Sequence, residues 1–245
     1  MTTHMRPAIR YQMRDYFTSG LVLFLVNVTL VCLVPFGFFS MNVNDSASYS
    51  AYGFAAAIFM LVSGIVTARQ IIRLCAQMGT SRKTAFLSLF PAAVIAALAI
   101  AAAGELLLIA AQAVFHGYVN IYFNDLYALI YVGFEKFLTP IQHGMSVLFS
   151  TCLMLACYGF GLFCTTLYWR LNKLGCVIGG IAMGVFFLVG LPEIFLHFEA
   201  QVMVLMEFCL TSPWNCMAVF LLTGAFFSVI SWFLVRNVNI RAGSK

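Results

Sequence analysis

The chain has 245 residues, of which 63% are hydrophobic and 9% are charged. Soluble domains carry roughly 45–50% apolar and about 25% charged residues, so this composition excludes a water-soluble fold. The formal net charge of +5 is spread over short segments between apolar runs, so we expect contact with anionic membrane lipids and no nucleic-acid partner.

Residues 5–17 carry two stripes at helical spacing. Apolar residues recur every four positions from Met5 to Phe17, and Arg6, Arg10 and Arg14 form a basic stripe beside them. A basic stripe next to an apolar one is typical of a helix lying in the headgroup layer of a membrane. We therefore expect an N-terminal amphipathic interfacial helix over 5–17.

Six apolar runs follow, and their lengths predict six transmembrane helices. The third run is longer than a hydrocarbon core of about 30 Å requires, so we expect it to be tilted or to project outside. The outer segment 193–213 is too charged to span and too apolar for a free loop, so we expect it to re-enter the outer leaflet. The expected spans are 20–39, 51–68, 85–114, 145–169, 174–191 and 214–235.

The positions of the cations predict the orientation of these spans. Of the 13 Lys and Arg residues, only Lys136 falls on the opposite side of the membrane from the others. Short loops rich in Lys and Arg stay in the cytoplasm. We therefore expect an all-α, polytopic membrane protein with a single transmembrane domain over 1–245 and both termini cytoplasmic. Its expected location is a cell membrane, which it crosses several times.

Small residues in two of the predicted spans allow helices to approach closely. Such residues can pack within one chain, which we favour, or form a seam between two subunits. They are Gly53, Ala57 and Gly64 in the second span and Gly175, Gly179, Gly180 and Gly184 in the fifth.

The sequence contains none of the common motifs for catalysis or nucleotide binding. It has no phosphate-binding loop, no His-Glu-x-x-His and no Gly-x-Ser-x-Gly elbow. We therefore expect no enzyme activity and no catalytic residue, cofactor or metal in this chain. Cysteines in apolar runs behave as small hydrophobes. Only Cys209 and Cys216 both lie near the expected outer face, and a disulfide between them stays an open alternative.

Glu105 is the one acidic residue within a continuous apolar run. A charge at the centre of a bilayer costs roughly 2.5–3.5 kcal/mol on insertion scales, so it implies a partner or a water-filled path. However, Glu105 falls toward the outer end of a long run, where water is close. It is therefore either a structural residue at the outer edge, which we favour, or a contact for a substrate or a proton in the transport pathway.

The inner segment 69–84 has the sequence of a helix, a break and a second helix start. Ile71, Leu74, Cys75 and Met78 follow helical spacing, with basic and polar residues on the other faces. Gly79 is a natural helix stop, and the Thr-Ser pair after it can cap the next helix. We expect a short helix parallel to the membrane, which is either an interfacial anchor or a docking helix for a cytoplasmic protein.

The stretch Gln77–Phe86 resembles the Gly-x-Ser-Arg-Lys-Thr-x-Phe loop of bacterial ATP-binding-cassette (ABC) transporter permeases of the second exporter type. These are six-span subunits with a basic start, inner termini and a partly re-entrant outer segment before the last span. The chain is similar in this layout, and Trp232 and Arg236 near its end are similar as well. The order of spans and termini is similar over the whole chain, whereas the sequence motif itself covers about ten residues.

This resemblance implies a role in a bacterial cytoplasmic membrane. Two permeases, identical or related, would pair, and each would dock on a separate cytoplasmic ABC ATPase subunit that binds ATP and Mg²⁺. The substrate would be a peptide, antimicrobial compound, drug or lipid-like molecule. Two alternatives are a substrate-capture subunit of an importer and an immunity or scaffold protein that transports nothing. The expected docking residues are Arg69, Arg73, Leu74, Met78, Gly79, Ser81, Arg82 and Lys83.

Overall fold

The computed structural model describes most of the chain, and almost all of the described residues are helical. Five of the helices are long and apolar enough to cross a membrane, which indicates a membrane protein. They correspond to the first, second, third, fourth and sixth predicted spans, and most of the fifth, 174–191, lies outside the described residues. The described residues are 5–38, 47–77, 79, 81–115, 121–133, 138–170, 175, 178–180, 184–185, 188–189, 193 and 197–236.

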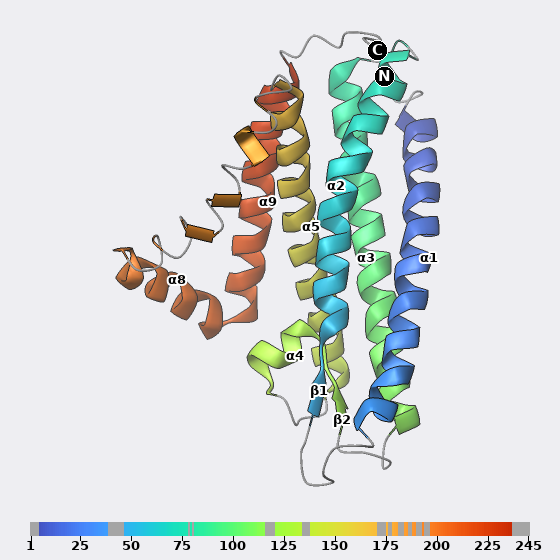
Figure 1. The fold of residues 1–245 in the computed structure, drawn as a ribbon, viewed down its shortest axis with the longest axis vertical. Helices are drawn as coiled ribbons and strands as arrows, with labels where there is room; N and C mark the ends of the chain where they lie inside the picture. The colour runs from blue at the N-terminus through green and yellow to red at the C-terminus, as the bar shows by residue number, and fades with distance from the viewer. Residues whose placement is uncertain are drawn as a thin grey trace.

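The five long helices lie side by side along the long axis of the molecule (Figure 1). Helix α5 packs against α2 and α9, and α3 packs against α1, α2 and α5. Six alanine residues of α3 are fully or nearly fully buried and belong to the main core: Ala85, Ala92, Ala93, Ala96, Ala97 and Ala101. The five helices are α1 (Met5–Phe38), α2 (Ala51–Gln77), α3 (Arg82–Phe115), α5 (Pro140–Arg170) and α9 (Pro213–Arg236).

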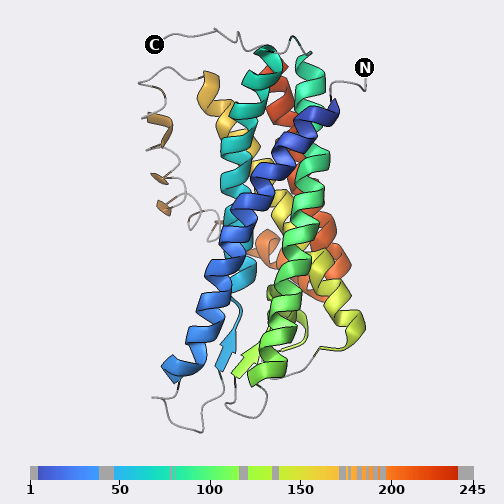
Figure 2. The ribbon, with the colours of Figure 1, turned by 90° about the vertical axis from the view of Figure 1, so that its right-hand side faces the viewer.

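The expected interfacial helix over 5–17 is not a separate element. It forms the beginning of α1, which continues without a break for 34 residues, or about 50 Å at the rise of an α-helix. Gln12 and Tyr16 are buried against the rest of the bundle, whereas Arg10 and Arg14 are exposed. Figure 2 shows α1 crossing α2 and α3 diagonally. Of the apolar stripe, Ile9 and Met13 pack against the chain's own core, whereas Phe17 is exposed.

Two short strands make the fold depart from the all-α expectation. Strand β1 (Ala47–Tyr49) pairs in parallel with β2 (Ile121–Phe123), and Tyr49 lies opposite Phe123. The rings of these two residues pack with their centroids 6.0 Å apart. The pairing joins the segment before α2 to the segment after α3, and the short helix α4 (Leu126–Tyr131) follows it.

The helix α8 (Glu199–Thr211) lies in the segment expected to re-enter the outer leaflet. It projects to one side of the bundle and meets α9 at Ser212, whose backbone is extended (Figure 1). None of the residues of α8 is buried. The segment 193–213, which we expected to re-enter the outer leaflet, therefore contains a helix.

The two ends of the bundle differ in charge. One end carries β1, β2 and α4, and we call it the strand end (Figure 1). The other end carries the start of α1, the turn between α2 and α3, and the last residues of α5 and α9 (Figures 1 and 2). We call it the basic end, because these segments hold the described Lys and Arg residues. The exposed ones are Arg10, Arg14, Arg69, Lys83 and Arg236.

Candidate functional site

The turn between α2 and α3 has the local structure that its sequence predicts. Gly79 has a φ of 69°, a left-handed conformation that favours glycine at a helix end. Ser81 caps α3, because its Oγ accepts a hydrogen bond from the Thr84 N–H at 3.3 Å and its carbonyl accepts one from the Ala85 N–H at 3.0 Å. The helix stop and the helix cap are both confirmed.

The expected short helix parallel to the membrane is not present. Residues 69–77 are the last turns of α2, which runs unbroken from Ala51. Ile71, Ile72 and Cys75 are buried in the main core, in the same cluster as Phe86. The apolar spacing in 69–77 therefore continues the inward face of α2, and the chain itself covers that face.

A small polar surface remains exposed at this turn. Arg69, Gln77, Gly79, Ser81 and Lys83 are exposed. Leu74 is only half-buried and adds some apolar surface. Of the other expected docking residues, Arg73, Met78 and Arg82 have side chains outside the described part of the chain. Among the described side chains, the exposed surface of this turn is thus mainly cationic and polar.

An apolar groove of about 390 Å³ lies next to this turn, between α3 and α9. Lys83 lies at one end of the groove, and the lining is otherwise almost entirely apolar. Such a groove suits hydrocarbon better than a polar solute. The lining residues are Lys83, Phe86, Leu87, Phe90, Ser228, Val229 and Trp232.

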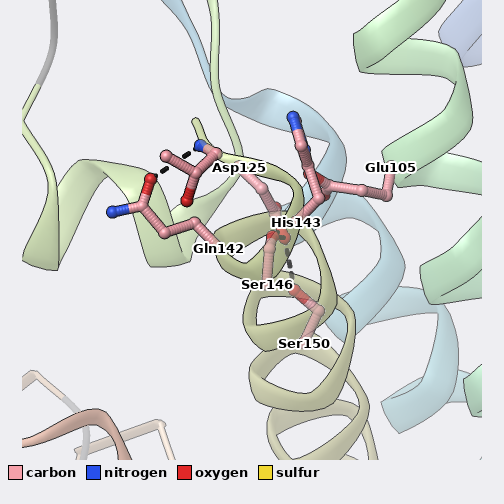
Figure 3. Close-up of polar contacts among 7 residues, drawn as sticks. Glu105, Asp125, Gln142, His143, Ser146 and Ser150 are labelled. Atoms are coloured by element: carbon pink, nitrogen blue, oxygen red, sulfur yellow. Dashed lines mark hydrogen bonds and ion pairs between the residues drawn. The ribbon is translucent and has the colours of Figure 1, made fainter. Parts of the chain in front are cut away.

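The strand end contains a largely buried polar cluster, in which only His143 is partly exposed. We define it as Glu105, Asp125, His143, Ser146 and Ser150 (Figure 3). Glu105 comes from α3, and the histidine and both serines lie on one face of α5. Glu105 is 6% exposed. One of its carboxylate oxygens lies 2.6 Å from His143 Nδ1, and the other lies 2.9 Å from Ser146 Oγ. The Glu105 side chain is therefore buried and hydrogen-bonded to other residues of the chain.

Asp125 enters the cluster from the residue that precedes α4. Its Oδ2 lies 3.0 Å from Ser146 Oγ and also accepts a hydrogen bond from Ser150 Oγ. Its Oδ1 faces Gly53 of α2, where an added Cβ would lie only 2.6 Å away. Gly53 is thus needed for the close approach of Asp125 to α2. The cluster joins α3, α5 and the connection between β2 and α4.

Four of the five cluster residues were missed by sequence reasoning. His143, Ser146 and Ser150 follow helical spacing, but the fourth span was expected to begin at residue 145, which left His143 in a loop. The structure begins α5 at Pro140, so His143 lies within the helix. Asp125 could not be placed, because its position depends on the pairing of β1 with β2.

Within the described residues, no group of three His, Cys, Asp or Glu side chains is arranged to hold a metal ion. Cys209 and Cys216 are free thiols, and Cys216 is buried. The disulfide left open for this pair is therefore not formed in the structure.

Comparison of the chain with models of protein families, with curated proteins and with solved structures finds no match.

Proposed function

We propose that this chain is the permease subunit of an ATP-driven ABC exporter, working as a pair in a bacterial cell membrane and coupled to a separate ATPase. The observation that carries the proposal is the turn between α2 and α3. Its sequence resembles the loop of the second exporter type, and it ends one long apolar helix and begins another. It lies at the basic end, which the distribution of Lys and Arg favours as the cytoplasmic side.

The exposed side chains of the turn suit a protein partner with acidic groups. Arg69 and Lys83 present two cations on either side of Gly79 and Ser81, and no described carboxylate forms an ion pair with either. Charge complementarity of this kind directs which partner binds and in which orientation. ATP and Mg²⁺ would be bound by that partner and not by this chain.

The packing of α2 gives the turn a mechanical connection to the bundle. Residues 69–77 belong to the same helix as the spanning part of α2, and their apolar face is fixed in the core. A force applied at the turn therefore moves α2 and α3 as a hairpin. Because α2 also packs along α5, such a movement reaches the middle of the bundle. Rigid elements that move against one another are a common means of coupling.

The proposal is tested by co-expressing the chain with any ABC ATPase that is encoded beside its gene. Lys83→Glu and Arg69→Glu place negative charge on the docking surface, and we expect each to reduce the yield of co-purified ATPase at least tenfold. Glu207→Lys on exposed α8, away from the turn, is the matched charge-reversal control and should keep the complex. Equal yields for all three variants would contradict docking at this turn.

A second measurement separates an ATP-driven transporter from the scaffold or immunity protein. The purified chain alone should not hydrolyse ATP, and the complex with its ATPase should do so at a rate that a transported compound stimulates. Robust hydrolysis by the chain alone would contradict the assignment of ATP to the partner. A chain that forms no complex with any neighbouring ATPase would instead favour the scaffold or immunity protein.

A further inference from the structure

The polar cluster at the strand end contains four close contacts between polar atoms. His143 Nδ1 lies 2.6 Å from Glu105 Oε1, and Ser150 Oγ contacts Asp125 Oδ2. Ser146 Oγ lies between the two acids, 2.9 Å from Glu105 Oε2 and 3.0 Å from Asp125 Oδ2. Each of these contacts needs one hydrogen atom between the two polar atoms, because two bare acceptors at such distances repel each other.

The side chains do not supply enough hydrogens if both acids are ionised. An ionised carboxylate can only accept, and a serine hydroxyl has one hydrogen to donate. His143 can fill the first contact and Ser150 the second. Ser146 can then fill only one of its two contacts, so one pair of facing oxygens is left without a hydrogen. A second proton on His143 would sit on its other ring nitrogen and would not reach this pair.

Among the residues that the structure describes, the nearby tyrosines do not supply the missing hydrogen. The titratable group on the adjacent α2 is Tyr52, but its hydroxyl donates to the Ile100 carbonyl at 2.7 Å. The hydroxyl of Tyr49 on β1 faces Asn27 instead. The described lysines and arginines belong to segments at the basic end. Among the described residues, His143 is therefore the only group near the two acids that can carry positive charge.

The burial of Asp125 is a second reason to expect that the two acids are not both ionised. This side chain is 5% exposed, and its Oδ1 has no hydrogen-bond partner among the residues that the structure describes. A bare oxygen of an ionised carboxylate is costly to bury, whereas a neutral carboxyl group carries much less charge to desolvate. Two ionised carboxylates on one serine would add mutual repulsion to that cost.

We propose that Glu105 and Asp125 bind one shared proton through Ser146, and that this is a proton-binding site built into the strand end. With a proton on either carboxyl group, that group donates to Ser146 Oγ and Ser146 donates to the other acid, so all four contacts are filled. The site holds α3, α5 and the β2–α4 connection together. Loss of the proton leaves two carboxylates facing one hydroxyl and weakens this connection. The proposal is independent of the transport function proposed above.

Infrared spectroscopy of the full-length chain in lipid nanodiscs tests the site directly. At about pH 7.5, well above the pH of roughly 4 at which exposed Asp and Glu lose their protons, the wild type should keep a protonated-carboxyl C=O band. In Glu105→Gln and in Asp125→Asn, the side-chain amide supplies the missing hydrogen to Ser146. We therefore expect each variant to lose the band, and Glu207→Gln, a change at an exposed acid of α8, to keep it.

The presence or absence of the protonated-carboxyl band in the wild type and in the variants decides whether the two acids share a proton. Absence of the band in the wild type, or its survival in either cluster variant, shows that no proton is shared between the two acids and overturns the proposal. Loss of the band in both variants, with the control unchanged, supports it. Size-exclusion profiles and circular dichroism of the same samples confirm that each variant is folded.

The pH dependence of stability provides a second test. Above about pH 7.5 an unfolded chain has both acids ionised and its histidines neutral, so the folded wild type holds one more proton than the unfolded state. Its folding equilibrium constant should then fall about tenfold for each pH unit until the shared proton is lost. Glu105→Gln lacks this extra proton, so the ratio of the wild-type constant to the variant constant should fall by the same factor. Parallel curves for the two proteins would overturn the proposal.

Discussion

Gly64 on α2 and Gly161 on α5 face each other where the two helices cross. A Cβ added at Gly64 would lie 2.5 Å from the carbonyl oxygen of Tyr158 and 3.3 Å from the Cα of Gly161. One added at Gly161 would overlap the carbonyl oxygen of Leu61. The helix backbones are therefore in direct contact, which is how small residues allow close packing in membranes. For Gly64, the expected packing within one chain is confirmed.

Gly161→Ala should destabilise the chain by about 1–3 kcal/mol, because its methyl group has no space and the two backbones must separate. The Thr165 hydroxyl donates to the Ile65 carbonyl at 2.7 Å one turn along α5, and we expect this hydrogen bond to be weakened as well. Thermal unfolding in detergent, followed by circular dichroism, measures the effect.

Gly144→Ala is the matched control for this crossing, because it lies on the same helix and an added Cβ would meet nothing within 4 Å. Alanine is favoured over glycine in a helix by about 0.8–1.0 kcal/mol. The control should therefore be unchanged or slightly stabilised. Equal stability of the two variants would show that α2 and α5 do not approach as closely as the structure indicates.

The long helices could be predicted from the sequence because their lengths follow from the thickness of the bilayer. The helix stop at Gly79 and the cap at Ser81 could be predicted because they depend only on local backbone geometry. The boundaries between the spans and the two expected surface helices were predicted wrongly, for a physical reason. In 5–17 and 69–77, an apolar stripe beside basic residues fits either a membrane surface or the chain's own core, and the sequence does not distinguish the two.

The polar cluster could not be predicted in the same way. Glu105 was singled out because an acid in an apolar run is costly, but its partners lie on other elements. Asp125 reaches it only because β1 and β2 pair and Gly53 leaves space beside α2. These are long-range relationships, and neighbouring residues in the sequence carry no signal for them. Helical spacing from His143 to Ser150 was the one local sign available.

Tyr52 should be sensitive to changes on α3. Its hydroxyl donates to the Ile100 carbonyl at 2.7 Å, and a Cβ added at Gly104 would overlap its ring. Tyr52→Phe should cost about 0.5–1.5 kcal/mol through loss of this hydrogen bond. Gly104→Ala should cost more, because it displaces the whole ring. Thermal unfolding compares both with Tyr11→Phe, a change at an exposed tyrosine that should have no effect. A smaller loss in Gly104→Ala than in Tyr52→Phe would contradict this packing.

The start of α3 should depend on its cap. Ser81→Ala removes the acceptor for the Thr84 N–H and should cost about 0.5–2 kcal/mol. Hydrogen–deuterium exchange should become faster in peptides covering the first turn of α3, while the middle of the helix stays protected. Ser81→Asp keeps a side-chain acceptor and is the control that should retain slow exchange. Faster exchange in Ser81→Asp as well would show that the serine acts by some means other than capping.

The orientation of the basic end can be tested by labelling cysteines with a membrane-impermeant maleimide. Lys83→Cys at the turn and Thr139→Cys at the strand end are both exposed positions, and the parent chain measures any signal from the native thiols. Because Lys and Arg are retained in the cytoplasm, we expect Thr139→Cys to react in intact cells and Lys83→Cys to react only after the cells are opened. The reverse pattern would place the turn between α2 and α3 outside the cell. No ATP-binding subunit could then reach Arg69 or Lys83, and the proposed coupling to an ATPase at this turn would be wrong.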